Sequence, residues 1–288
     1  MNNIFVNTIP HSGTHLVTKI IESLGYEHAV VKNRFYTVKP FYRRQQKAGI
    51  NWRTSKEIAI SPLSFEKKTV LVSVASPRLV KPSLVSRTFS EIYDYKYIIG
   101  HMPFSKDGNE VLEKYIKKTI TIIRDPRDMA ISMINHSRTR PLHHAHRYLF
   151  KKLHNDSERL HAVIEGYDND FGSLIGLNSM YDSMLQWKNQ STNLTIKFED
   201  LVGQKGGGTL EKQIKTIKSI IAHLNIPRKI SDDEILSIAD TSFGVSGTFR
   251  KGKIGGWKNI FLDKDKEFFK LKVNKVLVKN GYESNNQW

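Results

Sequence analysis

The pattern of apolar positions near the amino terminus predicts a strand, a tight loop and a helix. Residues 3–9 contain a core-like run that indicates a short buried strand, and Pro10 ends it. From Thr14 onward the apolar positions recur with helical spacing, and Gly25 is suited to a helix C-cap. The stripe on this helix comprises Leu16, Val17, Ile20, Ile21 and Leu24. An opening of this kind places the loop between the carboxyl end of a strand and the start of a helix.

Strand-like runs and helix-like spacings of apolar residues alternate along the rest of the chain. Strands are predicted at residues 70–74, 95–100, 119–123 and 194–198. Helices are predicted at residues 111–117, 127–135, 177–188 and 263–279, with two more beginning after Thr209 and Ser231. Alternation of strands and helices predicts an α/β fold whose mostly parallel sheet is covered on both faces. In such sheets, ligands bind outside the carboxyl ends of the strands.

Composition narrows the class of protein and of ligand. The 288 residues suit a single large domain over residues 1–288. A net charge of +17 favours an anionic ligand or partner. The absence of cysteine excludes disulfides, thiolate chemistry and sulfur-ligated zinc, and it fits a reducing compartment. No membrane span and no signal peptide are evident, so we expect a soluble, cytoplasmic protein.

The loop after the first strand has the properties of an anion site. A helix amino terminus offers free backbone N–H groups, and Gly13 lets the backbone approach a ligand closely. Ser12 and Thr14 add hydroxyl donors, although a plain helix N-cap explains them equally well. Residues 10–16 resemble the Pro-Lys-Ser-Gly-Thr-Thr-Trp loop with which cytosolic-type sulfotransferases hold the 5′-phosphosulfate of their cofactor. The resemblance assigns cofactor contacts to His11, Ser12, Gly13, Thr14 and His15.

Residues 119–132 carry the most specific pattern. An arginine at the end of a strand and a serine two helical turns later can converge on one phosphate. The segment is similar to the Arg-Asn-Pro-Arg/Lys-Asp-x-x-x-Ser stretch that binds the 3′-phosphate in sulfotransferases. On this resemblance, Arg124 and Ser132 take the two phosphate-binding positions, with Asp125 in place of the asparagine.

Three further stretches extend the resemblance to nearly the whole chain. Residues 247–259 resemble the late Arg-Lys-Gly loop that closes over the 3′-phosphate, which implicates Arg250, Lys251 and Gly252. Phe198 falls where the family has a tyrosine near the adenine, and core packing is the alternative for this side chain. Residues 97–103 resemble the Thr-His-Leu-Pro stretch that supplies the general base, so His101 is the expected base.

The resemblance implies a sulfotransferase fold and the transfer of a sulfuryl group from 3′-phosphoadenosine 5′-phosphosulfate (PAPS) to a hydroxyl or amine, with PAP as product. The family places a leaving-group lysine where this chain has His11, and a second lysine where it has Ile99. We therefore expect His11, protonated between phosphates, to act with His101 in catalysis; the alternatives are that another basic residue does the lysine's work or that the enzyme is slow. The unmatched segments 28–95 and 138–178 would form the pocket and lid for a small-molecule or saccharide acceptor, which could itself be anionic.

Other interpretations compete with this one. One alternative is a nucleotide-binding kinase of the same general architecture, and the missing P-loop lysine argues against it. The high charge also fits a protein that binds nucleic acid or an anionic surface, although we expect no nucleic-acid partner. His11 and Ile99 also fit a family member that binds PAP without transferring sulfuryl groups. His143 and His146 could share a helix face, but no matching carboxylates accompany them and no metal site is predicted.

Overall fold

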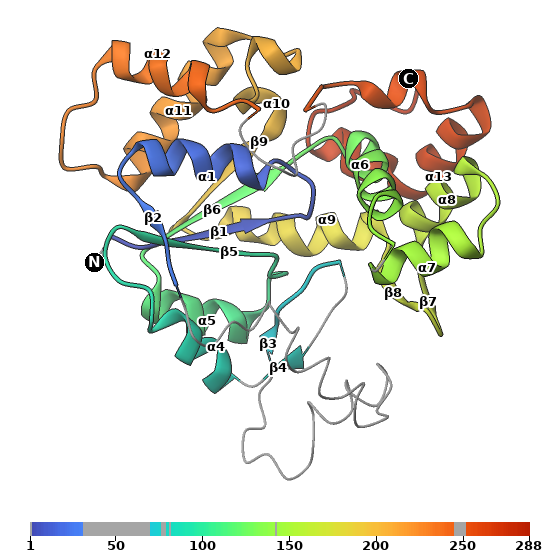
Figure 1. Cartoon of the computed structure of the whole chain (residues 1–288), viewed down its shortest axis with the longest axis horizontal. Coiled ribbons are helices and arrows are strands. Elements are labelled where there is room, and N and C mark those ends of the chain that lie inside the picture. Colours follow the sequence, from blue (N-terminus) through green and yellow to red (C-terminus); the bar gives the residue numbers. More distant parts are fainter. Residues whose placement is uncertain (1, 31–69, 76–78, 81, 142, 245–251) are drawn as a thin grey trace.

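A parallel sheet of five strands organises the molecule, and its order is β2-β5-β1-β6-β9 (Figure 1). The computed structural model describes residues 2–30, 70–75, 79–80, 82–141, 143–244 and 252–288. The five strands are β1 (Ile4–Thr8), β2 (Glu27–His28), β5 (Lys96–Gly100), β6 (Lys118–Ile123) and β9 (Asn193–Lys197). All four pairings in this sheet are parallel. The predicted α/β fold class is therefore confirmed.

Helices cover both faces of the sheet. One face packs on α1 (Thr14–Ser23), α11 (Leu210–Leu224) and α12 (Asp232–Thr241), and the opposite face on α4 (Pro82–Phe89), α5 (Lys106–Tyr115) and α9 (Leu177–Leu185) (Figure 1). The alternation within β1 divides the core, since Ile4 and Val6 belong to the first layer and Phe5 to the second. Two buried layers explain why the central strands are apolar on both faces.

A second group of helices lies beside the carboxyl end of the sheet. It contains α6 (Pro126–Arg138), α7 (His144–Lys151), α8 (Asp156–Glu165) and α13 (Asp263–Lys279), which gather on the right of Figure 1. Two small antiparallel ribbons complete the described fold: β3 (Val70–Leu71) with β4 (Leu79–Val80), and β7 (Gly166–Asn169) with β8 (Gly172–Ile175).

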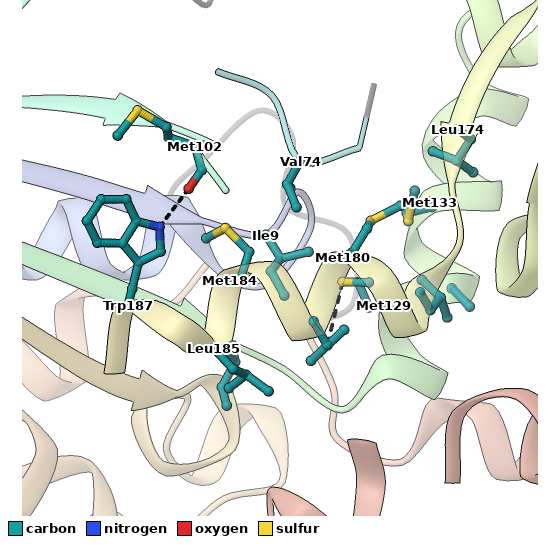
Figure 2. Packing of buried hydrophobic residues seen from close by; sticks show 14 of the residues in the cluster. Ile9, Val74, Met102, Met129, Met133, Leu174, Met180, Met184, Leu185 and Trp187 are labelled. Atoms are coloured by element: carbon teal, nitrogen blue, oxygen red, sulfur yellow. Dashed lines mark hydrogen bonds between the residues drawn. The ribbon is translucent and has the colours of Figure 1, made fainter. Parts of the chain in front are cut away.

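A methionine-rich layer joins this group to the sheet. Figure 2 shows side chains from β5's end, α6 and α9 meeting there, among them Met102, Met129, Met133, Met180 and Met184. Unbranched thioether side chains adapt to irregular gaps between elements that cross at different angles. Trp187 adds a directional contact, since its Nε1–H donates to the backbone oxygen of Met102 at 2.8 Å.

Several predicted elements have different boundaries in the structure. The strand expected at residues 70–74 is reduced to Val70–Leu71 and lies outside the main sheet. After these residues the chain turns toward the end of β5, because the N–H of Val74 donates to the oxygen of His101 at 2.7 Å. The helix expected at residues 111–117 begins at Lys106, since the Ser105 hydroxyl caps it by accepting from the N–H of Gly108 at 3.1 Å. The segment 28–68 lies largely outside the described residues.

Candidate active site at the carboxyl ends of three strands

The loop between β1 and α1 has a conformation that only glycine adopts easily. Gly13 has φ of 110° and precedes the first helical residue, Thr14. A Cβ atom at this position would lie 2.6 Å from Cδ2 of Phe198, so space as well as backbone geometry requires glycine. The N–H groups of Thr14 and His15 begin α1 and have no intrahelical acceptor. The loop thus brings backbone donors and the positive end of a helix to the sheet edge.

Ser12 serves a different purpose from the one its position suggested. Its side chain is fully buried, and its hydroxyl lies 2.6 Å from the oxygen of Ile9 and 3.0 Å from that of Ile122. Its backbone N–H also donates to Ile9, at 3.2 Å. The expectation that the Ser12 hydroxyl faces a ligand is therefore wrong, because its single hydrogen is committed to a carbonyl of the protein. Ser12 instead ties the loop to β6.

His101 stands where β5 ends, next to β1. Its Nδ1 lies 2.6 Å from the backbone oxygen of Thr8, which can only accept, so Nδ1 carries the proton and Nε2 is the basic atom. The Thr8 hydroxyl lies 3.1 Å from the same nitrogen and 2.8 Å from the hydroxyl of Thr14. Burial lowers the pKa of His101, which keeps the imidazole neutral at physiological pH. A neutral ring with an accepting Nε2 has the form that a general base needs.

Met102, the residue after His101, helps to fix the position of His101. The Asn7 amide donates to the oxygen of Met102 at 2.9 Å and accepts from its N–H at 2.7 Å. Asn7 is fully buried in β1, and Trp187 holds the same oxygen from the other side. Three hydrogen bonds to the backbone of Met102 therefore hold the chain next to His101 with little freedom.

Arg124 follows β6, the neighbour of β1 on the other side. Its Nη1 donates to the oxygen of His11 at 3.4 Å and its Nη2 to that of Lys253 at 2.9 Å. The guanidinium also lies over the Phe198 ring, with 4.4 Å between Cζ and the ring centroid. Its Nε is buried without a hydrogen-bond partner among the described residues. A cation that contacts two carbonyls and keeps an unused donor is suited to receive an anion.

The position of Phe198 resolves two interpretations of its role. The side chain is 4% exposed, packs against Gly13 and Ile122, and supports Arg124 from below. These contacts favour the core-packing alternative over contact with a nucleobase. Phe198 positions the arginine and closes the space beneath the loop.

Asp128 attaches the late loop to this region. Its carboxylate accepts from the N–H of Gly255 at 2.7 Å and from the N–H of Trp257 at 2.9 Å, and it lies 4.0 Å from Nη2 of Arg124. Gly252 lies on the same loop, half-buried, whereas Arg250 and Lys251 fall outside the described residues. The structure thus brings the described part of this loop, from Gly252 to Trp257, next to Arg124.

Helix α6 leads from Arg124 toward a group of histidines. Ser132 lies one turn after Asp128, half-buried, and His136 lies one turn further on. The ring of His136 meets that of His11, with centroids 4.6 Å apart. The sequence analysis missed His136, although helical spacing from Ser132 would have placed it on the same face.

His11 differs from the expected cation. Its backbone has φ of 69°, a conformation in which histidine is more frequent than most residues. Burial is the main reason that its pKa is lowered to about 3, and the neighbouring basic groups of His136, His101, His143 and Arg124 lower it further. His11 is therefore uncharged in the protein at neutral pH, and only an adjoining anion would bring a proton to it.

One acid and one phenol behind Arg124 were also not predicted from the sequence. Glu199 accepts from the N–H of Asp125 at 2.8 Å, and burial raises its pKa to about 7. The hydroxyl of Tyr181 donates to the backbone oxygen of Arg124. Both follow from tertiary packing of α10 (Phe198–Leu201) and α9 on the Arg124 segment, for which local sequence offers no signal.

Comparison with known proteins identifies the family. The sequence model of the sulfotransferase domain matches residues 1–281. The chain belongs to the sulfotransferase domain family. This match confirms the resemblance that the motifs indicated, and with it the expected enzyme class of a sulfotransferase.

Solved structures agree on the sulfotransferase fold. Mouse sulfotransferase SULT7A1 complexed with PAP has a TM-score of 0.57 at 19% identity, covering 97% of this chain and 87% of that one. Retinol dehydratase with androsterone and the inactive cofactor PAP has a TM-score of 0.52 at 14% identity, covering 96% and 80%. The same enzyme with retinol and PAP gives 0.51 at 13% identity, covering 96% and 81%. No curated protein matches the chain by sequence.

Neither a membrane-spanning helix nor a metal-binding group of side chains is present among the described residues. No helix among them has the length and apolar character to span a membrane. Within the same part of the chain, no three histidine or acidic side chains are arranged to hold a metal ion. The Nδ1 of His146 lies 3.0 Å from the oxygen of Ser137, and its ring stacks on Phe150.

Proposed function

We propose that this sulfotransferase-family chain transfers a sulfuryl group from PAPS to a hydroxyl or amine acceptor, with PAP as the released product. The observation that carries the proposal is the convergence of three different strand ends. The backbone donors of the Gly13 loop follow β1, the neutral His101 follows β5, and Arg124 follows β6. β1 lies between β5 and β6, at the position where ligands bind in parallel sheets.

The residues present fit a nucleotide with two phosphate ends. The unused buried Nε of Arg124 is the clearest sign, since a buried donor without an acceptor costs free energy. Arg124 and Ser132 would hold the 3′-phosphate, assisted by Arg250, Lys251 and Gly252. The N–H groups of residues 13–15 would hold the 5′ end.

PAPS and the protein would contribute different parts of the chemistry. PAPS supplies the activated sulfuryl group. Nε2 of His101 accepts the proton of the acceptor, because its Nδ1–H is already held by Thr8. The Gly13 loop and Arg124 orient the two phosphate ends, so that positioning and charge stabilisation provide most of the rate enhancement, as in phosphoryl transfer. His11, next to the loop, would take up a proton only when phosphates adjoin it.

The proposal also covers the class of acceptor, the acceptor pocket and the location in the cell. The acceptor is a small molecule or a saccharide, and the net charge of +17 favours an anionic one. Residues 28–95 and 138–178 would contribute its pocket within a single domain. We also propose a cytoplasmic location, because the cysteine-free sequence fits a reducing compartment.

Turnover with PAPS tests this function directly. The purified chain is incubated with PAPS and a panel of phenols, alcohols, amines and saccharides, and PAP release is followed together with the mass of each acceptor. PAP release that depends on an acceptor, with one sulfuryl group added to it, supports the proposal. Tight PAP binding without transfer to any acceptor would instead favour the non-transferring alternative that the uncharged His11 suggests.

A further inference from the structure

Arg127 follows Arg124 closely in the chain, but its guanidinium is engaged by groups of the protein. The residue is 2% exposed. Nε and Nη2 donate to the Asp125 carboxylate at 3.0 and 2.7 Å, and Nη1 donates to Oε1 of Glu283 at 2.5 Å. A buried guanidinium paired with two carboxylates is committed to the fold. Arg127 therefore affects the site through the groups that it holds.

Two tryptophan rings contact the Arg127 guanidinium. Its Cζ lies 4.0 Å from the ring centroid of Trp257 and 4.5 Å from that of Trp288. The two rings also meet edge to face, with centroids 5.3 Å apart and an interplanar angle of 85°. The indole N–H of Trp288 donates to Oδ1 of Asn274 on α13 at 2.8 Å, which orients the ring. Trp288 thus joins Arg127 and Trp257 to α13.

Trp257 belongs to the late loop that reaches Arg124. Its backbone N–H donates to Asp128, as does that of Gly255. Earlier in the same loop, the oxygen of Lys253 accepts from Nη2 of Arg124 at 2.9 Å. Because Trp257 follows Lys253 so closely in the chain, a shift of the Trp257 ring should displace the carbonyl that holds Arg124.

The segment 281–288 reaches this group by turning back after α13. Gly281, with φ of 64°, makes the turn, and the N–H of Tyr282 donates back to α13 at 2.9 Å. The Tyr282 hydroxyl lies 3.4 Å from one carboxylate oxygen of Glu199, whose other oxygen accepts from the N–H of Asp125. The segment therefore supports the start of α6 through three side chains, those of Tyr282, Glu283 and Trp288.

We infer that Glu283 and Trp288 are positioning residues for binding of the 3′-phosphate. Together with Arg127 they hold Trp257, and with it the late loop, in the position where the loop meets the end of β6. The inference rests on the proposed function, which assigns the 3′-phosphate to that strand end. The 5′ end of the nucleotide has a separate site, in the loop between β1 and α1. Loss of either side chain should thus weaken binding of a nucleotide that carries a 3′-phosphate and spare one that lacks it.

Nucleotide affinities test this inference through a ratio, the dissociation constant of AMP divided by that of PAP. PAP is measured by calorimetry, and AMP, which lacks the 3′-phosphate, by competition against PAP. In Trp288→Ala the ratio should fall about tenfold, because PAP binds more weakly while AMP affinity is unchanged. Trp288→Phe should restore most of the ratio, since an aromatic ring remains against Arg127 and Trp257. In Glu283→Gln the ratio should fall about threefold, because Asp125 still pairs with Arg127.

Controls separate positioning from overall stability. Leu224→Ala removes a fully buried side chain from the opposite layer of the core, near the amino end of β1, so it should lower the midpoint of chemical denaturation and keep the ratio. Asp128→Asn and Trp288→Ala should be non-additive for PAP binding, because both act through Trp257. Glu283→Gln keeps every buried ring, so it tests the inference even where Trp288→Ala lowers stability.

The possible outcomes distinguish the inference from the function on which it rests. An unchanged ratio in Trp288→Ala or in Glu283→Gln would overturn the inference, as would equal weakening of PAP and AMP. Failure of the wild-type protein to bind PAP, or equal affinity of the wild type for PAP and AMP, would instead refute the proposed function.

Discussion

The two sides of the candidate site are built in different ways. On the cofactor side, strand ends and backbone groups set the geometry, as with the Gly13 loop, the peptide of Met102 and the carbonyls that hold Arg124. Beside His11, by contrast, the geometry is set by side chains on a helix end and a turn, namely His136, His143 and the exposed Arg140. One side is fixed by the sheet, whereas the other depends on side chains at the surface.

This difference predicts that substitutions on the two sides have different consequences. A substitution beneath the strand ends disturbs backbone contacts and should affect cofactor binding or catalysis for every acceptor. A substitution of the exposed Arg140 should leave these backbone contacts, and with them PAP affinity, intact. The predictions below test the cofactor side, from the largest expected effect to the smallest.

His101→Ala should cause the largest loss. Removing the base should lower kcat by about 10²–10⁴-fold, because Nε2 of His101 is the atom assigned to the acceptor's proton. The lowered pKa of His101 also predicts that wild-type activity persists to pH values below 6.5 before protonation abolishes it. Steady-state kinetics across pH and PAP calorimetry measure the two effects. His154→Ala, an exposed histidine before α8, is the control. Near-normal turnover of His101→Ala with intact PAP binding would exclude His101 as the base.

Arg124→Ala should weaken PAP binding by about 100-fold, because charge-assisted hydrogen bonds to a phosphate contribute about 1.5–3 kcal/mol each. Arg124→Lys should recover only part of this affinity, since an ammonium cannot reproduce the planar fork of donors. Calorimetry with PAP measures both, with Arg228→Ala on the far surface as the control. An unchanged affinity of Arg124→Ala for PAP would show that the 3′-phosphate does not bind at this strand end.

Asp128→Asn should destabilise the late loop. The carboxylate accepts from two backbone N–H groups, whereas an amide has a single acceptor oxygen. One N–H would then lose its partner, at a cost of about 2 kcal/mol in the free energy of unfolding. Chemical denaturation measures this cost, and PAP affinity should fall with it because the loop adjoins Arg124. An unaltered unfolding curve would show that Asp128 does not hold the loop.

His11→Lys should increase kcat about tenfold at neutral and alkaline pH, because lysine carries the charge that His11 lacks. The gain should be similar at neutral and alkaline pH, because lysine remains protonated and His11 uncharged across this range. A pH profile of kcat for both proteins measures the change. Rates that fall at every pH would mean that a cation at this position is not what the reaction needs.

Glu199→Gln should have the smallest effect, on stability. Burial raises the folded-state pKa of Glu199 to about 7, above its ordinary value of 4.5. The folded protein then binds the proton more tightly than the unfolded chain, so stability decreases as pH rises between these values and stays lower above them. Removing the charge should add about 1 kcal/mol at pH 8, less than the full pKa difference implies because Glu199 keeps some solvent contact.

Denaturation of wild type and Glu199→Gln at pH 5 and pH 8 measures this difference, with exposed Glu211→Gln as the control. A variant that is less stable than wild type at pH 8 would contradict the assignment. It would show that the carboxylate is needed in its charged form beside Arg124.

Sequence predicted the elements with strong local signals. The strand and helix around Gly13 were predicted because a buried run, a glycine and a helical stripe coincide. The helix predicted from Arg127 begins one residue earlier, at Pro126. The predicted final helix agrees with Asp263–Lys279. The β7–β8 ribbon was not predicted, since its short polar strands lack an apolar alternation.

The site was predictable in its positions and less so in its contacts. His101, Arg124 and the Gly13 loop meet as the resemblance implied, because parallel strands end at one edge. The inward turn of the Ser12 hydroxyl, the loss of charge on His11 and the meeting of His11 with His136 depend on burial and on partners more than 100 residues away. Such effects arise only once the chain is folded.

The most direct test of the central claim is a thermal-shift titration with PAP, compared with AMP and ATP. PAP at about 100 times its dissociation constant should stabilise the chain by about 2.7 kcal/mol. AMP lacks the 3′-phosphate, so it should give little shift if Arg124 forms the site proposed. A clear PAP shift with little response to AMP is the predicted result. No PAP shift at low salt, or an equal shift with AMP, would contradict the account of the strand-end site.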